Sequence, residues 1–280
     1  MLSDLFHYQF VQHAILASIL ASIVCGIIGV IIIEKKLVML SGGIAHTAYG
    51  GVGLGYLLGF EPILGAFLIS LLSAICITWI KRKGDTGSEV LIGLFWSLGM
   101  ALGILFIALK PGYPPDLSSY LFGSLLSITK SNLYLIAGLT LIVLFLVLAL
   151  FDYWKAYLFD EEFAKVLGIA TVWLEYLLLI LVAMAVVVLI RVVGIILVLA
   201  LLTAPPAIAG LFTKSLSTRM VVAIFVGALV CLAGLMISYA LNIPSGAAIV
   251  ILSVSVYLIA YFLKNMLLRG KFQPNQPKGD

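Results

Sequence analysis

Nine long apolar stretches, separated by short polar or charged segments, limit what this chain can fold into more than any other feature. A helix needs about 20 mostly apolar residues to cross the hydrocarbon core of a membrane, whereas transmembrane β-strands are about 10 residues long with alternating polarity. The stretches therefore predict membrane-spanning helices. They cover residues 10–33, 40–59, 62–80, 90–109, 132–151, 172–190, 192–212, 220–240 and 245–263.

The composition excludes a soluble domain. Of the 280 residues, 64% are hydrophobic and only 10% are charged, whereas soluble domains are roughly 45–50% apolar and about 25% charged. We expect one all-α transmembrane domain over residues 1–270, a bundle of about nine spans with eight or ten still open, and a polar cytoplasmic tail over 271–280. Its surroundings are membrane lipid, and no nucleic-acid partner is expected. Any energy-coupling domain must lie on another chain.

The basic residues predict the orientation in the membrane. With the N-terminus outside, nine spans leave 13 Lys and Arg side chains on the inner side and 3, at Lys110, Lys130 and Arg191, on the outer side. Cytoplasmic segments of membrane proteins carry such an excess, so we expect an outer N-terminus and a cytoplasmic C-terminus. Residues 117–128 are apolar but too short to span, which predicts a half-helix or re-entrant segment.

The second predicted helix is the most unusual, because glycine recurs along it. Gly51, Gly55 and Gly59 are spaced by four residues and lie on one helical ridge. Such ridges let helix backbones approach closely in lipid. Simple packing is one interpretation of this ridge and of Gly42 and Gly43 before it. A close seam that lines a path or a dimer interface is the other.

His46 lies in this helix, about ten residues beyond the basic pair Lys35 and Lys36. At the rise of an α-helix this places it about 15 Å into the membrane, where an ionisable residue is a candidate functional group. Imidazole suits zinc and other divalent transition metals. A histidine satisfied by a backbone carbonyl is the alternative. One histidine is not a metal site, although a symmetric dimer would bring two copies together.

The longest inner segment, residues 152–172, predicts a short amphipathic helix. Asp160 can cap it ahead of an acidic first turn, its apolar residues share one face, and Gly168 can end it. Such a helix is either a surface-lying loop or a docking element for a soluble partner, and the residues leave both open. The residues singled out are Asp160, Glu161, Glu162, Phe163, Ala164, Leu167 and Gly168.

Two further features have a plain and a functional interpretation. Pro205 and Pro206 lie inside an apolar span and remove two backbone donors, which kinks or breaks a helix. The result is either a static kink or a hinge that lines a cavity. His7 and His13, near the outer end of the first span, are either ordinary surface residues or contacts for an incoming cation or a docked binding protein.

Motifs for bond chemistry are absent from the sequence. It contains no GxSxG or HExxH, no paired carboxylates within a span, and no GxxxxGK[ST] phosphate loop. Residues 40–43 match the start of an ABC ATPase signature, but they open a membrane helix. We therefore expect a transport subunit and not an enzyme, with no resident cofactor and with any ATP bound by a partner chain.

Four motifs together resemble the membrane permease subunits of ABC-type importers of zinc, manganese or iron(II), the ABC-3 metal permease family. They are residues 41–59 with Ala45 and His46, the segments 115–123 and 159–168, and residues 193–209. The resemblance covers nearly the whole chain.

The resemblance implies a homodimer of all-helical subunits in a prokaryotic cell membrane, related in fold to the vitamin B12 and siderophore importers. It implies cytoplasmic ABC ATPase subunits and an extracytoplasmic metal-binding protein as partners. It assigns residues 159–168 to coupling with the ATPase, and it places His46 on the metal path.

One position departs from the family pattern. Many members carry an aspartate four residues before the histidine, where this chain has Gly42. Without that carboxylate the site suits manganese less, because manganese prefers oxygen ligands, so zinc is favoured over manganese or iron. Two alternatives stay open: a permease of the same fold for a chelate such as a siderophore or cobalamin, and a secondary metal transporter that works without an ATPase.

Overall fold

Helices make up all the regular secondary structure in the part of the chain that the computed structural model describes, residues 8–83, 88–111, 123 and 125–271. This confirms the predicted all-α class. In chain order they are α2 (Gln9–Glu34), α3 (Val38–Leu58), α4 (Pro62–Lys83), α5 (Ser88–Ala108), the 3-10 turn η1 (Leu125–Ser127), α7 (Lys130–Ala149), α8 (Phe151–Phe159), α9 (Glu161–Val166), α10 (Thr171–Val193), α11 (Ile195–Phe212), α12 (Leu216–Leu241) and α13 (Ser245–Lys271).

Each of the nine predicted stretches is a long helix. Eight of these helices, among the described residues, are long and apolar enough to cross a membrane. The ninth, α3, has 21 residues, but its glycines, hydroxyl side chains and His46 make it less apolar. It lies against α4, α5 and α10, so neighbouring protein covers much of it. The prediction of about nine spans is confirmed.

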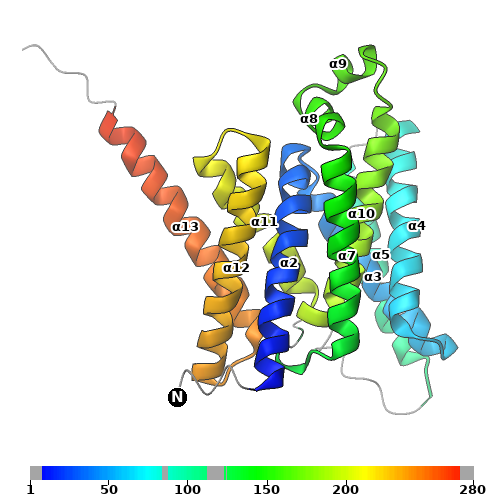
Figure 1. Cartoon of the computed structure of the whole chain (residues 1–280). Coiled ribbons are helices and arrows are strands. Elements are labelled where there is room, and N and C mark those ends of the chain that lie inside the picture. Colours follow the sequence, from blue (N-terminus) through cyan, green and yellow to red (C-terminus); the bar gives the residue numbers. More distant parts are fainter. Residues whose placement is uncertain (1–7, 84–87, 112–122, 124, 272–280) are drawn as a thin grey trace, which may run out of the picture.

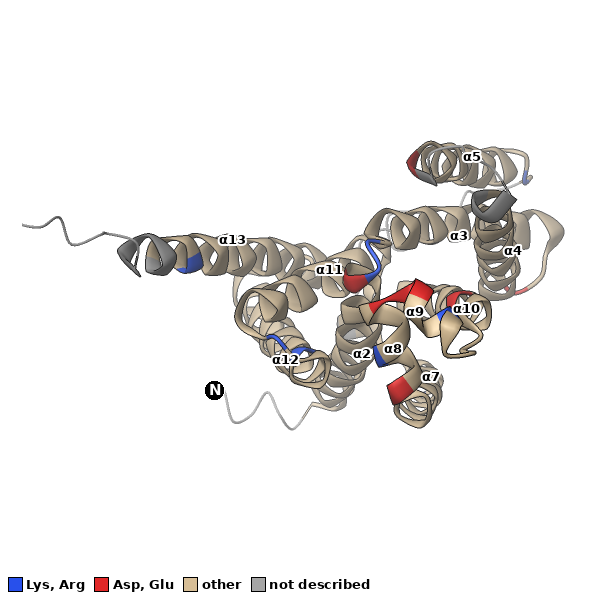
Figure 2. Ribbon diagram, turned by 90° about the horizontal axis from the view of Figure 1, so that it is seen from above, with Lys and Arg blue, Asp and Glu red and all other residues tan. Residues whose placement is uncertain are grey.

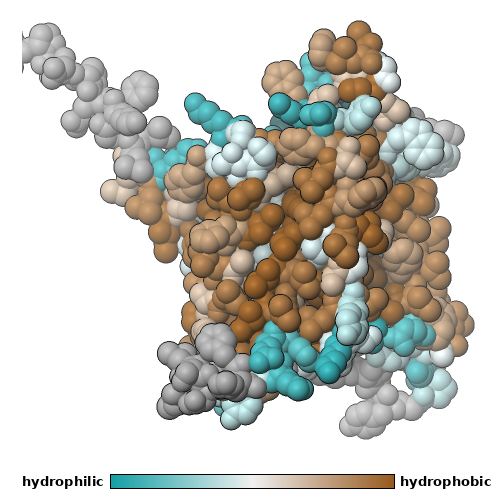
Figure 3. All heavy atoms as spheres, in the orientation of Figure 1, coloured by the Kyte–Doolittle hydropathy of each residue, from teal (hydrophilic) through white to brown (hydrophobic). Residues whose placement is uncertain are grey.

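The long helices run alternately up and down, so the bundle has two distinct ends (Figure 1). One end, called here the α9 end, carries α8, α9, the α2–α3 joint and the α11–α12 loop. The opposite end carries the start of α2 and the α12–α13 turn. Between the two ends the side chains form a broad apolar band, with hydrophilic residues gathered above and below it (Figure 3). This distribution is the one expected of a protein that crosses a membrane.

The centre of the bundle is formed by α2 and α10, whereas α5 and α13 are peripheral. In the apolar window of α2, 72% of the residues are buried, against 22% in α5 and 28% in α13. Seen from the α9 end, α13, α11, α3 and α5 follow one another along one side of the molecule (Figure 2). No other helix among the described residues covers that side.

The glycines of α3 allow it to lie close to two helices at once. A Cβ atom on Gly51 would overlap the backbone of Gly65 in α4, and one on Gly55 would lie 2.6 Å from Cα of Pro62. Gly42 and Gly43 instead face α5. The predicted close packing along the ridge is therefore present at Gly51 and Gly55, which both face α4, and a second close contact, with α5, lies on another face of the helix.

Gly59 does not take part in this packing. It follows the last residue of α3, has a φ of 77°, and its N–H donates to the carbonyl oxygen of Gly55 at 2.9 Å. No neighbour lies within 4 Å of the place where its Cβ would be. Gly59 therefore ends the helix in a left-handed conformation that favours glycine.

α11 continues through Pro205 and Pro206, so the helix is not broken there. Because proline has no N–H, the carbonyl of Leu202 loses its usual helical donor at position 206. That oxygen faces α2 where Gly29 leaves room for it, because a Cβ on Gly29 would overlap it. The function of the two prolines as a hinge stays a prediction.

The predicted re-entrant segment 117–128 lies mostly outside the described residues. Its last part contains the turn η1, in which Leu125 is buried. The backbone N–H of Leu125 donates to Oγ of Ser245 at 3.2 Å, which fixes this turn to the beginning of α13.

Candidate functional site

His46 lies on α3 between two side chains of α5. Its ring stacks on the indole of Trp96, with ring centroids 4.1 Å apart and an interplanar angle of 15°. Its Nδ1 atom is 3.3 Å from Sδ of Met100. Trp96 and Met100 are four residues apart and so share one face of α5, and all three side chains are partly buried. The plain interpretation of His46 was a histidine satisfied by a backbone carbonyl, but its Nδ1 atom contacts the Met100 thioether instead.

Gly42 makes this arrangement possible. It lies one helical turn before His46, and a Cβ on it would be 3.0 Å from Cζ3 of Trp96. The indole therefore occupies the space beside His46 into which a longer side chain at position 42 would extend. Among the described residues no three His, Cys, Asp or Glu side chains come together, so His46 has no carboxylate or thiol cluster around it.

Other residues of interest lie apart from this cluster. His13 has its Nδ1 atom 3.3 Å from the carbonyl oxygen of Ile128, a contact that supports a structural role. His7 falls outside the described residues. Sequence reasoning missed Glu175, which is buried in the second turn of α10, and it missed Trp96 and Met100. The sequence signal for Trp96 and Met100 was their spacing of four residues on one helix. An aromatic residue and a methionine at that spacing are, however, common in any apolar span.

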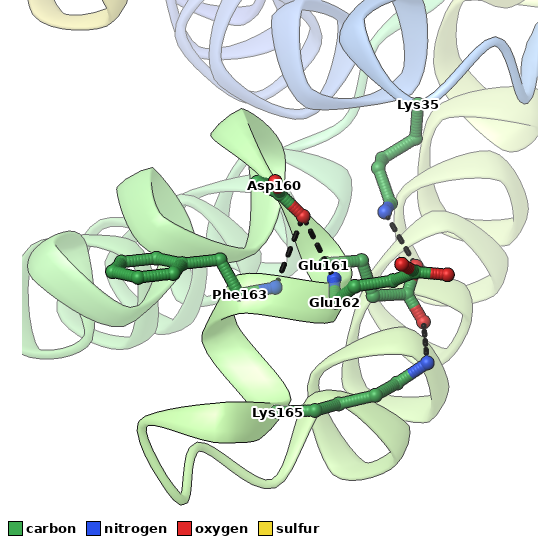
Figure 4. A network of polar contacts seen from close by, with 6 residues as sticks. All are labelled: Lys35, Asp160, Glu161, Glu162, Phe163 and Lys165. Carbon is green, nitrogen blue, oxygen red and sulfur yellow. Dashed lines mark hydrogen bonds and ion pairs between the residues drawn. The ribbon is translucent and has the colours of Figure 1, made fainter.

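The second candidate site is α9, and its local structure follows the prediction. The Oδ1 atom of Asp160 accepts hydrogen bonds from the backbone N–H groups of Glu162 at 2.9 Å and Phe163 at 3.0 Å (Figure 4). A side-chain cap of this kind satisfies donors that the first turn of a helix leaves unpaired. After the helix, Gly168 has a φ of 78°, which agrees with its predicted position as a terminator.

The apolar side chains of α9 and its flanks point away from the bundle. Phe159 is 91% exposed and Val166 is 82% exposed, and Phe163 and Leu167 are also largely exposed. Only Ala164 is buried against the bundle. These four exposed residues are called here the α9 surface, and the segment that carries them lies at the end of the bundle, beyond most of the apolar band (Figures 1 and 3). Exposed clusters of large apolar side chains mark sites of interaction with another protein or with a membrane.

An ion-pair network holds α9 on the bundle. Glu161 binds Lys35, the residue directly after α2, at 2.8 Å and Lys165 of α9 at 3.1 Å (Figure 4). The Nζ atom of Lys35 also lies 3.6 Å from the ring centroid of Tyr157, which is buried in α8. Burial alone would raise the pKa of Glu161, but the hydrogen bonds and charges of the two lysines outweigh it and lower that pKa below its usual 4.5.

A cavity of about 400 Å³ opens beside the α9 surface. It lies between α8 and the α11–α12 loop, and its polar wall includes Lys155, Lys214 and Arg219. Arg219 pairs with Glu34 at the end of α2 and donates to the carbonyl oxygen of Thr213 at 3.1 Å. The α9 end thus combines an exposed apolar surface with a basic hollow.

The network around Glu161 predicts a pH dependence. Since the folded state lowers the pKa of Glu161, its stabilising effect is complete above pH 4.5 and is lost as the pH falls through the lower folded value. We expect the unfolding temperature of the purified chain to fall with acidification below pH 4.5 more steeply in the wild type than in Glu161→Gln. Parallel curves for the two proteins would contradict this assignment.

The fold and the two sites define a class: a multi-spanning helical membrane protein with an exposed apolar surface at one end of its bundle. The sequence matches the model of the ABC 3 transport family over residues 7–264. The chain belongs to this family, which confirms the resemblance to the permease subunits of ABC-type metal importers. It is a transport component and not an enzyme, since a partner ATPase hydrolyses the ATP in such systems.

Relatives cover nearly the full length of the chain. It is 42% identical over 253 residues to an uncharacterised membrane protein of Synechocystis, with 90% of each chain covered. It is 31% identical to the manganese import system permease protein ScaB of Streptococcus gordonii, with 94% of each covered. It is 30% identical to the manganese transport system membrane protein MntC of Halalkalibacterium halodurans, over 92% of this chain and 89% of that one.

Solved structures agree with the fold. A structure of PsaBC from Streptococcus pneumoniae in complex with Fab matches with a TM-score of 0.86 and 31% identity, covering 97% of this chain and 100% of that one. A metal-chelate type ABC transporter in an inward-facing conformation matches with a TM-score of 0.71 at 18% identity, over 90% of this chain and 85% of that one. The second likeness concerns the fold alone.

Proposed function

We propose that this chain is the membrane permease of an ATP-driven importer of a divalent transition metal, with zinc favoured over manganese or iron. Two copies form the path, cytoplasmic ATPase subunits dock at the α9 end, and an extracytoplasmic metal-binding protein delivers the metal at the opposite end. The observation that carries this proposal is the α9 surface. Its apolar side chains are not covered by the rest of the chain and lie on a capped helix that is anchored by Lys35, as docking of a partner protein would require.

The distribution of charge supports the orientation. The α9 end carries Lys35, Lys155, Lys165, Lys214 and Arg219, whereas Lys110, Lys130 and Arg191 lie toward the opposite end. By the positive-inside rule the α9 end faces the cytoplasm, where ATP is available. The N-terminus then lies outside and α13 ends on the cytoplasmic side.

The uncovered side of the molecule supports a homodimer. This side is lined by α13, α11, α3 and α5 (Figure 2). Of these helices, α3 carries His46. A second copy facing this side would bring two His46 side chains toward a common axis, which a single copy cannot do.

The choice of zinc rests on the donors near His46. The relatives named above for manganese belong to the same family, but this chain has Gly42 where a carboxylate is expected, and Met100 beside the imidazole. Manganese prefers oxygen ligands, whereas imidazole and sulfur suit zinc. A chelate permease is the weaker alternative, because its support is a likeness of fold at 18% identity.

His46→Ala tests the path. In cells that rely on this importer we expect zinc uptake to fall at least about tenfold, as for the loss of a metal-binding group, while the ATPase still co-purifies with the chain. His13→Ala is the matched control, since His13 contacts a backbone carbonyl near one end of α2. Wild-type uptake in the His46 variant would remove this residue from the path.

A further inference from the structure

The cluster on α3 and α5 has the donors of a metal site that the sequence motifs do not indicate. Nδ1 of His46 and Sδ of Met100 are 3.3 Å apart. Two ligands of one tetrahedral zinc, with nitrogen at about 2.05 Å and sulfur at about 2.3 Å (the value for a cysteine thiolate), stand roughly 3.5 Å from each other. The two atoms are therefore close to the separation at which one ion could bind both.

The same distance also fits an N–H···S hydrogen bond between a protonated Nδ1 and the thioether. In the metal-free chain this bond holds the imidazole in place. A metal ion binds the other neutral tautomer, in which Nε2 carries the proton and Nδ1 offers its lone pair. The pair can thus exist in both states without moving either helix.

Trp96 disfavours a carboxylate at position 42 on steric grounds, because a side chain there would have to displace the indole. Its ring covers one face of His46 at 4.1 Å, and its Cζ3 lies 3.0 Å from a Cβ built on Gly42. An aspartate at position 42 would direct its carboxylate into the space that the indole fills. Gly42 and Trp96 therefore form one structural unit: because Gly42 has no side chain, the indole of Trp96 can fill the space beside His46.

We propose that Met100 and Trp96 complete the His46 site, and that this nitrogen–thioether pair beside an indole, in place of an aspartate at position 42, selects zinc over manganese. The inference rests on the proposed function, because it assumes that metal passes His46. Thioether sulfur is a soft ligand that suits zinc better than manganese, and the apolar indole offers manganese no oxygen. Met100 is a metal ligand in this proposal, and Trp96 is a positioning residue.

The test measures uptake of zinc and manganese in competition, with the permease expressed together with its ATPase and binding protein. Met100→Leu keeps the size of the side chain and removes the sulfur, so we expect the zinc-to-manganese uptake ratio to fall about tenfold. Met39→Leu is the matched control, because Met39 is an exposed methionine on the same helix as His46, and its ratio should stay at the wild-type value. Met100→Gln places an oxygen donor at the same point. This variant replaces Met100→Leu in the same measurement if the leucine variant does not reach the membrane.

Substitutions at position 42 provide an independent test of the proposal. Gly42→Asp alone should lose transport of both metals, because the new side chain meets the indole. Gly42→Asp combined with Trp96→Ala should regain transport with a ratio shifted toward manganese. Unchanged ratios in the Met100 variants, or a double variant that still prefers zinc, would overturn the proposal. If His46→Ala abolishes uptake while these ratios stay unchanged, only this inference fails. If His46→Ala has no effect, the proposed path fails with it.

Discussion

Replacing Gly51 with alanine is expected to prevent α3 from docking on α4. The added Cβ would overlap the backbone oxygen and carbon of Gly65, and backbone atoms within two packed helices cannot move aside as the end of a flexible side chain can. Overpacking of this kind costs about 1–3 kcal/mol and sometimes more, and here the two backbones touch directly. We expect little folded protein in the membrane and a clearly lower unfolding temperature in detergent.

Gly138→Ala is the matched control for this variant. Gly138 lies within α7, and nothing is within 4 Å of the place where its Cβ would be. Alanine has the higher helix propensity by about 1 kcal/mol, so this variant should be as stable as the wild type or slightly more stable. Equal stability of the two variants would contradict this prediction, because it would show that α3 and α4 can move apart at Gly51 without loss of stability.

Replacing Phe163 with aspartate is expected to abolish metal uptake without unfolding the chain. Phe163 is 57% exposed, so a charge there costs the isolated permease little. In a complex with the ATPase the same position would be covered, and an unpaired charge buried at an interface costs several kcal/mol. We expect uptake to fall at least about tenfold and the ATPase to be lost on co-purification.

Leu109→Asp provides the comparison. Leu109 follows α5 at the opposite end of the bundle and is 59% exposed, so the substitution changes charge and apolar area similarly, far from α9. The ATPase should remain bound to this variant. Retention of the ATPase by Phe163→Asp, with normal uptake, would rule out the α9 surface as its docking site.

The sequence allowed the helices to be predicted because long apolar runs in a membrane protein have few alternatives to helix. The cap at Asp160 and the end at Gly168 were also predictable, because they depend on local backbone geometry. The partners of these elements were not. Lys35 and Glu161 are 126 residues apart, and no spacing rule links them.

The His46 site shows the same limit. The histidine was found because an ionisable residue is rare inside an apolar span, but Trp96 and Met100 look like ordinary core residues until α5 is placed against α3. Likewise, the spacing of Gly51, Gly55 and Gly59 predicts one face, and the first two do share the face toward α4, but α3 ends at Gly59 and packs on α5 with a second face. Packing partners and helix ends depend on tertiary contacts that periodicity does not contain.

The anchor of α9 gives the molecule a short mechanical linkage. Lys35, which binds Glu161, is the residue directly after α2. Lys36 follows with a φ of 56°, and α3 begins at Val38. A displacement of α9 would therefore reach the joint between α2 and α3 through this ion pair, in addition to α8 and α10, which α9 contacts directly. His46 is eight residues further along α3, which corresponds to about 12 Å, or two helical turns. A movement of α9 that shifts the α2–α3 joint would therefore be transmitted to the imidazole through only two turns of helix.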